Sequence, residues 1–166
     1  MNLPTFNKLM KETEARRHPP EWRMFLELCE LYLKQKRIKN PVVVELGSTE
    51  NNCSDFYEQL LGAKYIDADK LGKKTIDILS ISGGYYKDVK KNFDKYSSKC
   101  NGIIAIHDIE SCRYKKRKES EAWKFWYELK ALTACGAKEL ENFLFISIHR
   151  KRIKGNQRGI GVIIKR

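Results

Sequence analysis

Short apolar runs recur along the chain and alternate with segments in which apolar residues have helical spacing. The run from Pro41 to Leu46 is rich in valine and carries one glutamate. Such a run is typical of a strand that is buried on both faces of a parallel sheet. Comparable runs predict five further strands, at residues 64–68, 75–81, 102–107, 143–149 and 159–165.

Helices are predicted before the first strand and between several of the others. In the first forty residues, a proline pair precedes apolar residues at helical spacing, and cations gather before Asn40 and Pro41, where a helix would end. Residues 54–61 form a second predicted helix, which Gly62 ends. Two more helices are predicted from apolar faces made of Tyr86, Val89, Phe93 and Tyr96, and of Trp123, Trp126, Leu129 and Leu132. Gly136 would end the last of these helices, and we expect both of its tryptophans in the core.

Strands that alternate with helices predict an α/β fold. We expect a Rossmann-like, doubly wound and mostly parallel sheet, whose final strand is antiparallel because no helix separates the last two strands. The length of 166 residues fits one domain. We interpret residues 1–166 as a single domain, with an N-terminal helical segment at 1–40 and an α/β core at 41–166.

The five cysteines are scattered and odd in number, without a C-x-x-C pair or histidines at zinc spacing. This pattern suggests neither a disulfide framework nor a metal site, so the cysteines are interpreted as reduced thiols. There is no run of eighteen apolar residues and no apolar N-terminal leader. We therefore expect a cytoplasmic protein with no membrane partner.

A strong positive charge changes the expected partners. The chain has 33 Lys and Arg against 21 Asp and Glu, a formal net charge of +12, which favours polyanions such as nucleic acid. Two predicted loops carry much of this charge, through Arg113, Lys115, Lys116, Arg117 and Lys118, and through Arg150, Lys151 and Arg152. They could bind phosphates beside a site at the same sheet edge, or be ordinary solvated loops.

Four strings, taken in order, resemble class I S-adenosylmethionine-dependent methyltransferases. Residues 42–47 (VVVELG) are similar to that family's first motif, and residues 64–69 (KYIDAD) to its second strand. Residues 76–79 (IDIL) with a later V-K-K, and residues 102–109 (GIIAIHDI), are similar to the strings of small bacterial and phage-type members. The resemblance covers about three quarters of the chain and is carried by the order of the strings.

The resemblance implies a cofactor site for S-adenosylmethionine at the carboxyl ends of the strands. The implied cofactor-binding residues are Glu45, Gly47, Asp67, Asp69, Ser82 and Gly83. Ligands of open parallel sheets bind at this edge, where a glycine permits close approach and a carboxylate can accept hydrogen bonds from ribose hydroxyls. His107 and Asp108 are the implied catalytic pair, with His107 as the base if the acceptor must lose a proton.

The sequence also departs from the family. The usual second and third glycines of the first motif are missing, and residues 81–86 (ISGGYY) replace an acid-rich segment. Only Lys70 to Thr75 separates the second predicted strand from the third, where the family has another strand and two helices. The link could be taut, a hairpin, or exchanged with another copy of the chain. We expect the taut link, with an exposed sheet edge that favours a homo-oligomer.

Two functions remain open at this stage. The first is a methyltransferase that uses S-adenosylmethionine on an unknown, possibly phosphate-bearing or small-molecule acceptor. The second is a catalytically inactive module of the same fold that binds nucleic acid through its basic edge. The methyl acceptor cannot be derived from the sequence.

Overall fold

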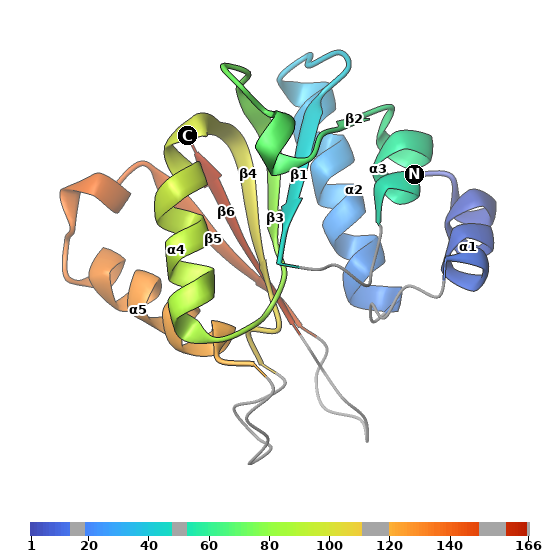
Figure 1. Ribbon diagram of the computed structural model, residues 1–166. Coiled ribbons are helices and arrows are strands. Elements are labelled where there is room, and N and C mark those ends of the chain that lie inside the picture. Colours follow the sequence, from blue (N-terminus) through green and yellow to red (C-terminus); the bar gives the residue numbers. More distant parts are fainter. Residues whose placement is uncertain (14–18, 48–52, 111–119, 150–158, 166) are drawn as a thin grey trace.

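The protein is built around one six-stranded sheet. The computed structural model describes residues 1–13, 19–47, 53–110, 120–149 and 159–165. The strand order is β2-β1-β3-β4-β6-β5 (Figure 1). The strands are β1 (Val42–Leu46), β2 (Lys64–Tyr65), β3 (Ile76–Ile81), β4 (Cys100–His107), β5 (Phe143–Ile148) and β6 (Ile160–Lys165).

The direction of the strands confirms the predicted fold class. β2, β1, β3 and β4 are parallel, whereas β6 is antiparallel to both β4 and β5. Among the described residues, no strand lies beyond β2 in this sheet, and no further strand or α-helix lies between β2 and β3, as the missing crossover unit predicts. The result is a Rossmann-like α/β sheet.

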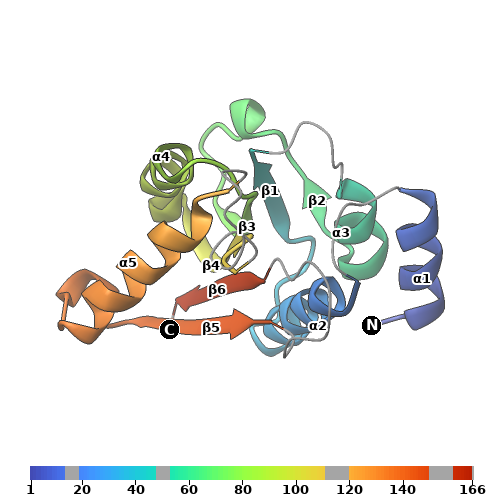
Figure 2. The same ribbon diagram turned by 90° about the horizontal axis from the view of Figure 1, so that it is seen from below.

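Helices cover both faces of the sheet (Figure 2). The α-helices are α1 (Leu3–Glu12), α2 (Pro19–Gln35), α3 (Ser54–Leu61), α4 (Tyr86–Tyr96) and α5 (Ala122–Ala134), with short 3-10 turns η1 (Ala68–Lys70), η2 (Ser97–Lys99) and η3 (Lys138–Leu140). α2 and α3 lie on one face and α4 and α5 on the other. Among the described helices, none has both the length and the apolar character needed to cross a membrane.

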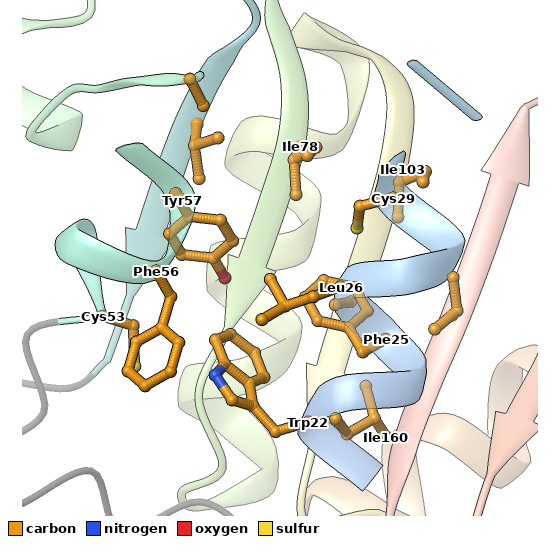
Figure 3. Packing of buried hydrophobic residues seen from close by; sticks show 14 of the residues in the cluster. Trp22, Phe25, Leu26, Cys29, Cys53, Phe56, Tyr57, Ile78, Ile103 and Ile160 are labelled. Carbon is orange, nitrogen blue, oxygen red and sulfur yellow. The ribbon is translucent and has the colours of Figure 1, made fainter. Parts of the chain in front are cut away.

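An aromatic cluster joins the N-terminal helices to the sheet. Trp22 and Phe25 of α2 stack at 5.3 Å, and the Trp22 ring meets Phe56 and Tyr57 of α3 edge-on at 5.8 and 5.7 Å (Figure 3). All four side chains are buried. The predicted N-terminal helical segment is therefore part of the core and covers one face of the sheet.

The face of α5 differs from the prediction. Trp126 is buried as expected, but Trp123 is only half-buried and Leu132 is 44% exposed. Phe125 takes the core position instead and meets Phe93 of α4 edge-on at 5.2 Å. The prediction of Trp123 as a core residue is wrong, because α5 is rotated so that Phe125 faces α4.

The second strand is shorter than predicted, and this explains how so short a link can cross the sheet. β2 has two residues and is parallel to β1, so the hairpin alternative is excluded. The chain then forms η1 and turns at Gly72, while Leu71 is buried on the α4 face of the sheet. The link is not taut, because a two-residue strand leaves little distance to return. Self-association through the exposed edge stays a prediction.

The burial of the thiols gives a direct test of this packing. Cys29, Cys53 and Cys100 are buried, whereas Cys135 is exposed. Burial raises the pKa of Cys29 and raises that of Cys100 to about 11. In a Cys112→Ser variant we expect a thiol reagent at pH 8 to label one cysteine per native chain and four in denaturant. Rapid labelling of more than one thiol in the native state would contradict the packing.

Candidate functional site

The carboxyl ends of β1 and β3 are joined around Glu45. Its Oε1 atom lies 3.5 Å from the Ser82 hydroxyl, which donates, and its Oε2 atom is buried. The Ser82 amide donates to the Leu46 carbonyl at 2.8 Å. A buried carboxylate is costly in a sheet unless it has polar surroundings. This strand end is thus a polar position within an apolar sheet.

Gly47 follows β1 and turns the chain away from it. Its φ is +82°, which side chains rarely adopt, and an added Cβ would lie 3.4 Å from the Ser82 carbonyl oxygen. Glu45, Gly47 and Ser82 therefore lie together, as the resemblance implied.

Gly83 and Asp108 form the neighbouring contact. A Cβ on Gly83 would lie only 2.3 Å from Oδ2 of Asp108. Asp108 has a φ of +61°, and its amide donates to the Gly159 carbonyl at 3.0 Å. A left-handed aspartate costs about 1–3 kcal/mol of backbone strain, and such residues cluster at functional sites. The structure thus brings the end of β4 against the loop that follows β3.

The two candidate acids after β2 have different surroundings. Asp67 directly follows the strand, and its exposed carboxylate pairs with Lys70 at 2.8 Å. The pKa of Tyr65 is raised to about 12, mainly by burial, with smaller contributions from the negative charges of Glu45 and Asp67. Asp67 and Glu45 therefore lie around one ring.

Asp69 lies apart from this group. It is exposed within η1. The pKa of Lys95 is raised mainly by a hydrogen bond with Tyr96, with a smaller contribution from Asp69. Asp69 is thus close to the C-terminal part of α4, on the opposite face from Tyr65.

His107 is buried, which does not favour its predicted role as a base. The imidazole is 2% exposed, its Nε2 lies 2.9 Å from the Ser80 hydroxyl, and the Trp22 and Phe25 rings lie 5.8 and 6.1 Å away. Alternation along β4 places Ile103 and His107 on the same face, which α2 covers. A side chain enclosed in this way has little direct access to an acceptor, and its described contacts are with Ser80 and the rings of α2.

Sequence reasoning missed two tyrosines at this site. The first is Tyr65, whose pKa is raised in part by the negative charges of both Glu45 and Asp67, so its ring lies near both carboxylates. Tyr85 directly precedes α4, two residues after Gly83, and is 65% exposed. The loop before it is held by the Glu121 amide, which donates to the Gly84 carbonyl at 2.7 Å. No local sequence pattern predicts that Tyr85 is exposed while the residues that follow it pack on the sheet.

The basic clusters proposed as partner-binding loops lie outside the described residues. They comprise Arg113, Lys115, Lys116, Arg117 and Lys118, and Arg150, Lys151 and Arg152. The flanking residues are described: Glu110 and Ser120 at the end of β4 and the start of α5, and His149 and Gly159 between β5 and β6. Their role in nucleic-acid binding stays a prediction.

Comparisons with known proteins establish the fold. No protein-family model matches the sequence, and a search of curated proteins finds no match. An rRNA methylase from Streptococcus thermophilus has a similar structure, with a TM-score of 0.53 and 12% identity over 84% of this chain and 96% of that chain. The plantazolicin methyltransferase BpumL, solved with a pentazolic desmethylPZN analog and SAH, has a TM-score of 0.52 and 13% identity over 96% of this chain and 89% of that chain. The chain thus has the class I methyltransferase fold.

Proposed function

We propose that the protein is a methyltransferase that uses S-adenosylmethionine. The observation that carries this proposal is the gathering of Glu45, Gly47 and Ser82, next to Gly83 and Asp108, at the carboxyl ends of three adjoining strands. Ligands of open α/β sheets bind at this edge. The structural similarity to two methyltransferases supports the fold on which this proposal rests.

The residues present fit an adenosyl cofactor. Asp67 offers an exposed carboxylate beyond β2, which suits two ribose hydroxyls because carboxylate oxygens only accept hydrogen bonds. Gly47 leaves the end of β1 without a side chain. Glu45 and Ser82 keep the ends of β1 and β3 in register. When bound, S-adenosylmethionine supplies a methyl group on a positively charged sulfur that is already activated for transfer.

Little proton chemistry is then required of the protein. Its main task is to align the acceptor, and a base is needed only for an acceptor that must lose a proton. With His107 enclosed, Asp108 is the remaining candidate. It is only partly buried and lies against Gly83 at the same edge.

For the acceptor we propose a phosphate-bearing molecule. The net charge of +12 favours such a partner. The two basic clusters follow β4 and β5 in the sequence, so they are candidates for contacting its phosphates. The similar rRNA methylase, by its name, acts on RNA.

Calorimetric titration tests the cofactor assignment. We expect the purified protein to bind S-adenosylmethionine and its demethylated product, and Asp67→Asn to weaken binding by about tenfold to a hundredfold, because a hydrogen bond to a charged group contributes about 1.5–3 kcal/mol. Glu45→Gln should also weaken binding. The matched control is Asp69→Asn, which removes the same charge two residues away and should bind as the parent does.

Two outcomes would contradict the proposal. If the parent protein, shown to be folded by thermal melting, binds neither ligand, the protein is a module of this fold without the cofactor. If the Asp67 and Asp69 variants lose affinity equally, then the loss reflects net charge and not contact with the ribose.

A further inference from the structure

A row of lysines runs along α4, starting next to the candidate site. Lys87, Lys91 and Lys95 are spaced four residues apart, and Lys99 of η2 continues the spacing. Four residues of helix advance by about 6 Å and return to nearly the same side. The four lysines, which we call the α4 row, are all exposed. They form one line of positive charge that leads away from the carboxyl edge of the sheet.

The leading lysines of the α4 row form no salt bridge to an acid among the described residues. Lys90, which lies outside the row, pairs with Glu128 at 3.1 Å. By contrast, Lys87 and Lys91 make no salt bridge within the described part of the chain. Lys95 and Lys99 rest over the Tyr96 ring at 4.9 and 6.0 Å from its centroid. Their charges therefore remain available to an external anion.

A groove follows the same helix. It is wide open to solvent, has a volume of about 590 Å³ and is lined by Tyr86, Lys87, Lys90, Lys91, Asp94 and Lys95, so four lysines and one acid face it. Two acids flank the row: Asp88 and Asp94 are each three residues from Lys91 and lie about 60° around the helix from it, on opposite sides. The positive strip is thus narrow. A flat anionic membrane would cover both acids at once, whereas a single polyanionic strand contacts a narrower surface, on which lysines outnumber the acids.

An exposed aromatic ring stands at the end of the row that is nearest to the site. Tyr85 is the residue before α4 and is 65% exposed, although it follows Gly83 and Gly84, which lie at the candidate cofactor edge. Exposed rings next to cations are the combination with which proteins hold single-stranded nucleic acid, since phosphates meet the cations and a base stacks on the ring. An acidic peptide has no comparable use for an exposed ring.

We propose that the α4 row and Tyr85 form a binding track for single-stranded nucleic acid, whose stacked base is presented at the carboxyl edge of the sheet. This inference rests on the proposed function for its purpose, since the track would bring a nucleic-acid acceptor to the methyl donor. The track is separate from the two basic loops. It uses only residues of α4, η2 and the loop before α4.

Fluorescence anisotropy with a labelled 12-nucleotide RNA of mixed sequence, without cofactor, tests the track. We expect the triple variant Lys87→Gln, Lys91→Gln and Lys95→Gln to bind at least about tenfold more weakly at low salt. The slope of log affinity against log salt should fall by about 2, since each phosphate contact on a single strand contributes about 0.7. The matched control is Lys11→Gln, Lys36→Gln and Lys39→Gln, which removes three exposed lysines on α1 and at the end of α2. This control variant should change the RNA affinity and the salt slope much less than the α4 variant does.

A second pair of variants tests the ring. Tyr85→Ala should weaken binding by about fivefold or more without changing the salt slope, because stacking carries no charge. Tyr85→Phe should keep the affinity. Thermal melting of every variant checks that it is folded.

Several results would overturn the track. The first is that the parent protein does not bind the RNA, and the second is that the two triple lysine variants lose RNA affinity equally. The third is that Tyr85→Ala binds the RNA as tightly as the parent does. The fourth is that a poly-glutamate peptide of matched charge competes for the protein as well as unlabelled RNA does. The cofactor titration remains independent. If the α4 variants lose RNA binding but the parent protein does not bind S-adenosylmethionine, the track is supported and the proposed methyltransferase function is wrong. If the parent protein binds S-adenosylmethionine but the α4 variants bind RNA normally, the proposed function is supported and the track is wrong.

Discussion

Replacing Trp22 by alanine should lower the free energy of unfolding by about 3–5 kcal/mol, as large aromatic truncations in cores do. The Trp22 side chain is fully buried and contacts rings from three parts of the chain, namely Phe25 of α2, two rings of α3, and His107 at the end of β4. Its removal would leave a cavity between α2, α3 and the sheet. Since domains of this size are stable by about 5–15 kcal/mol, the loss is a large fraction of the total.

The chain offers a matched control for this experiment. Trp123 of α5 is only half-buried, so Trp123→Ala removes the same side chain from a position that packs less. Urea denaturation followed by circular dichroism would measure both variants. A loss for Trp22→Ala no larger than that for Trp123→Ala would show that α2 does not pack on the sheet as described, and would reopen the question of whether His107 is accessible.

Gly102→Ala is the second substitution for which we expect a severe effect. A Cβ at this position of β4 would lie 2.1 Å from the Asp77 carbonyl oxygen, 3.0 Å from its carbonyl carbon and 3.3 Å from its Cα. All three are backbone atoms, so no side-chain rotation relieves the clash. The register between β3 and β4 is irregular at this point, because two residues of β4, Asn101 and Gly102, lie opposite the single residue Asp77 of β3.

The strand that would have to move is tied to a third one. Oδ2 of Asp77 accepts a hydrogen bond from the Val42 amide at 2.7 Å, so a shift of Asp77 also disturbs the start of β1.

Overpacking a core typically costs 1–3 kcal/mol of stability and sometimes more. We expect Gly102→Ala to lower the free energy of unfolding by about 3 kcal/mol, measured by urea denaturation as a shift in the midpoint. Gly84→Ala is the control, because no atom lies within 4 Å of a Cβ there and its φ is ordinary; it should change stability by less than about 0.5 kcal/mol. Similar losses for the two variants would contradict the close approach of β3 and β4.

The candidate site shows where reasoning from sequence succeeds and where it stops. Glu45 and Gly47 were expected at the end of a buried strand, and they lie there because the valine run fixes the strand and its end. The choice between Asp67 and Asp69 was left open. It depends on β2 ending after two residues, a feature set by pairing with β1 and not by the local residues.

The fate of His107 illustrates the same limit. The sequence places this residue at the end of a strand, which is also where catalytic residues of such folds lie. Whether the imidazole is open or enclosed depends on α2, more than seventy residues earlier in the chain, docking Trp22 and Phe25 against it. Helical spacing shows that α2 has an apolar face, but not which strand end that face covers.

The order and type of most elements, the class of the sheet and the helix stop at Gly62 were determined by the sequence alone, because periodicity, runs of β-branched residues and left-handed glycines act over a few neighbouring positions. The tertiary structure decided the rotation of α5, the short β2 with its folded link, the burial of His107 and the exposure of Tyr85 beside the α4 row. These features arise from contacts between segments that are distant in the chain, and packing between such segments is chosen by the whole core and not by any local pattern.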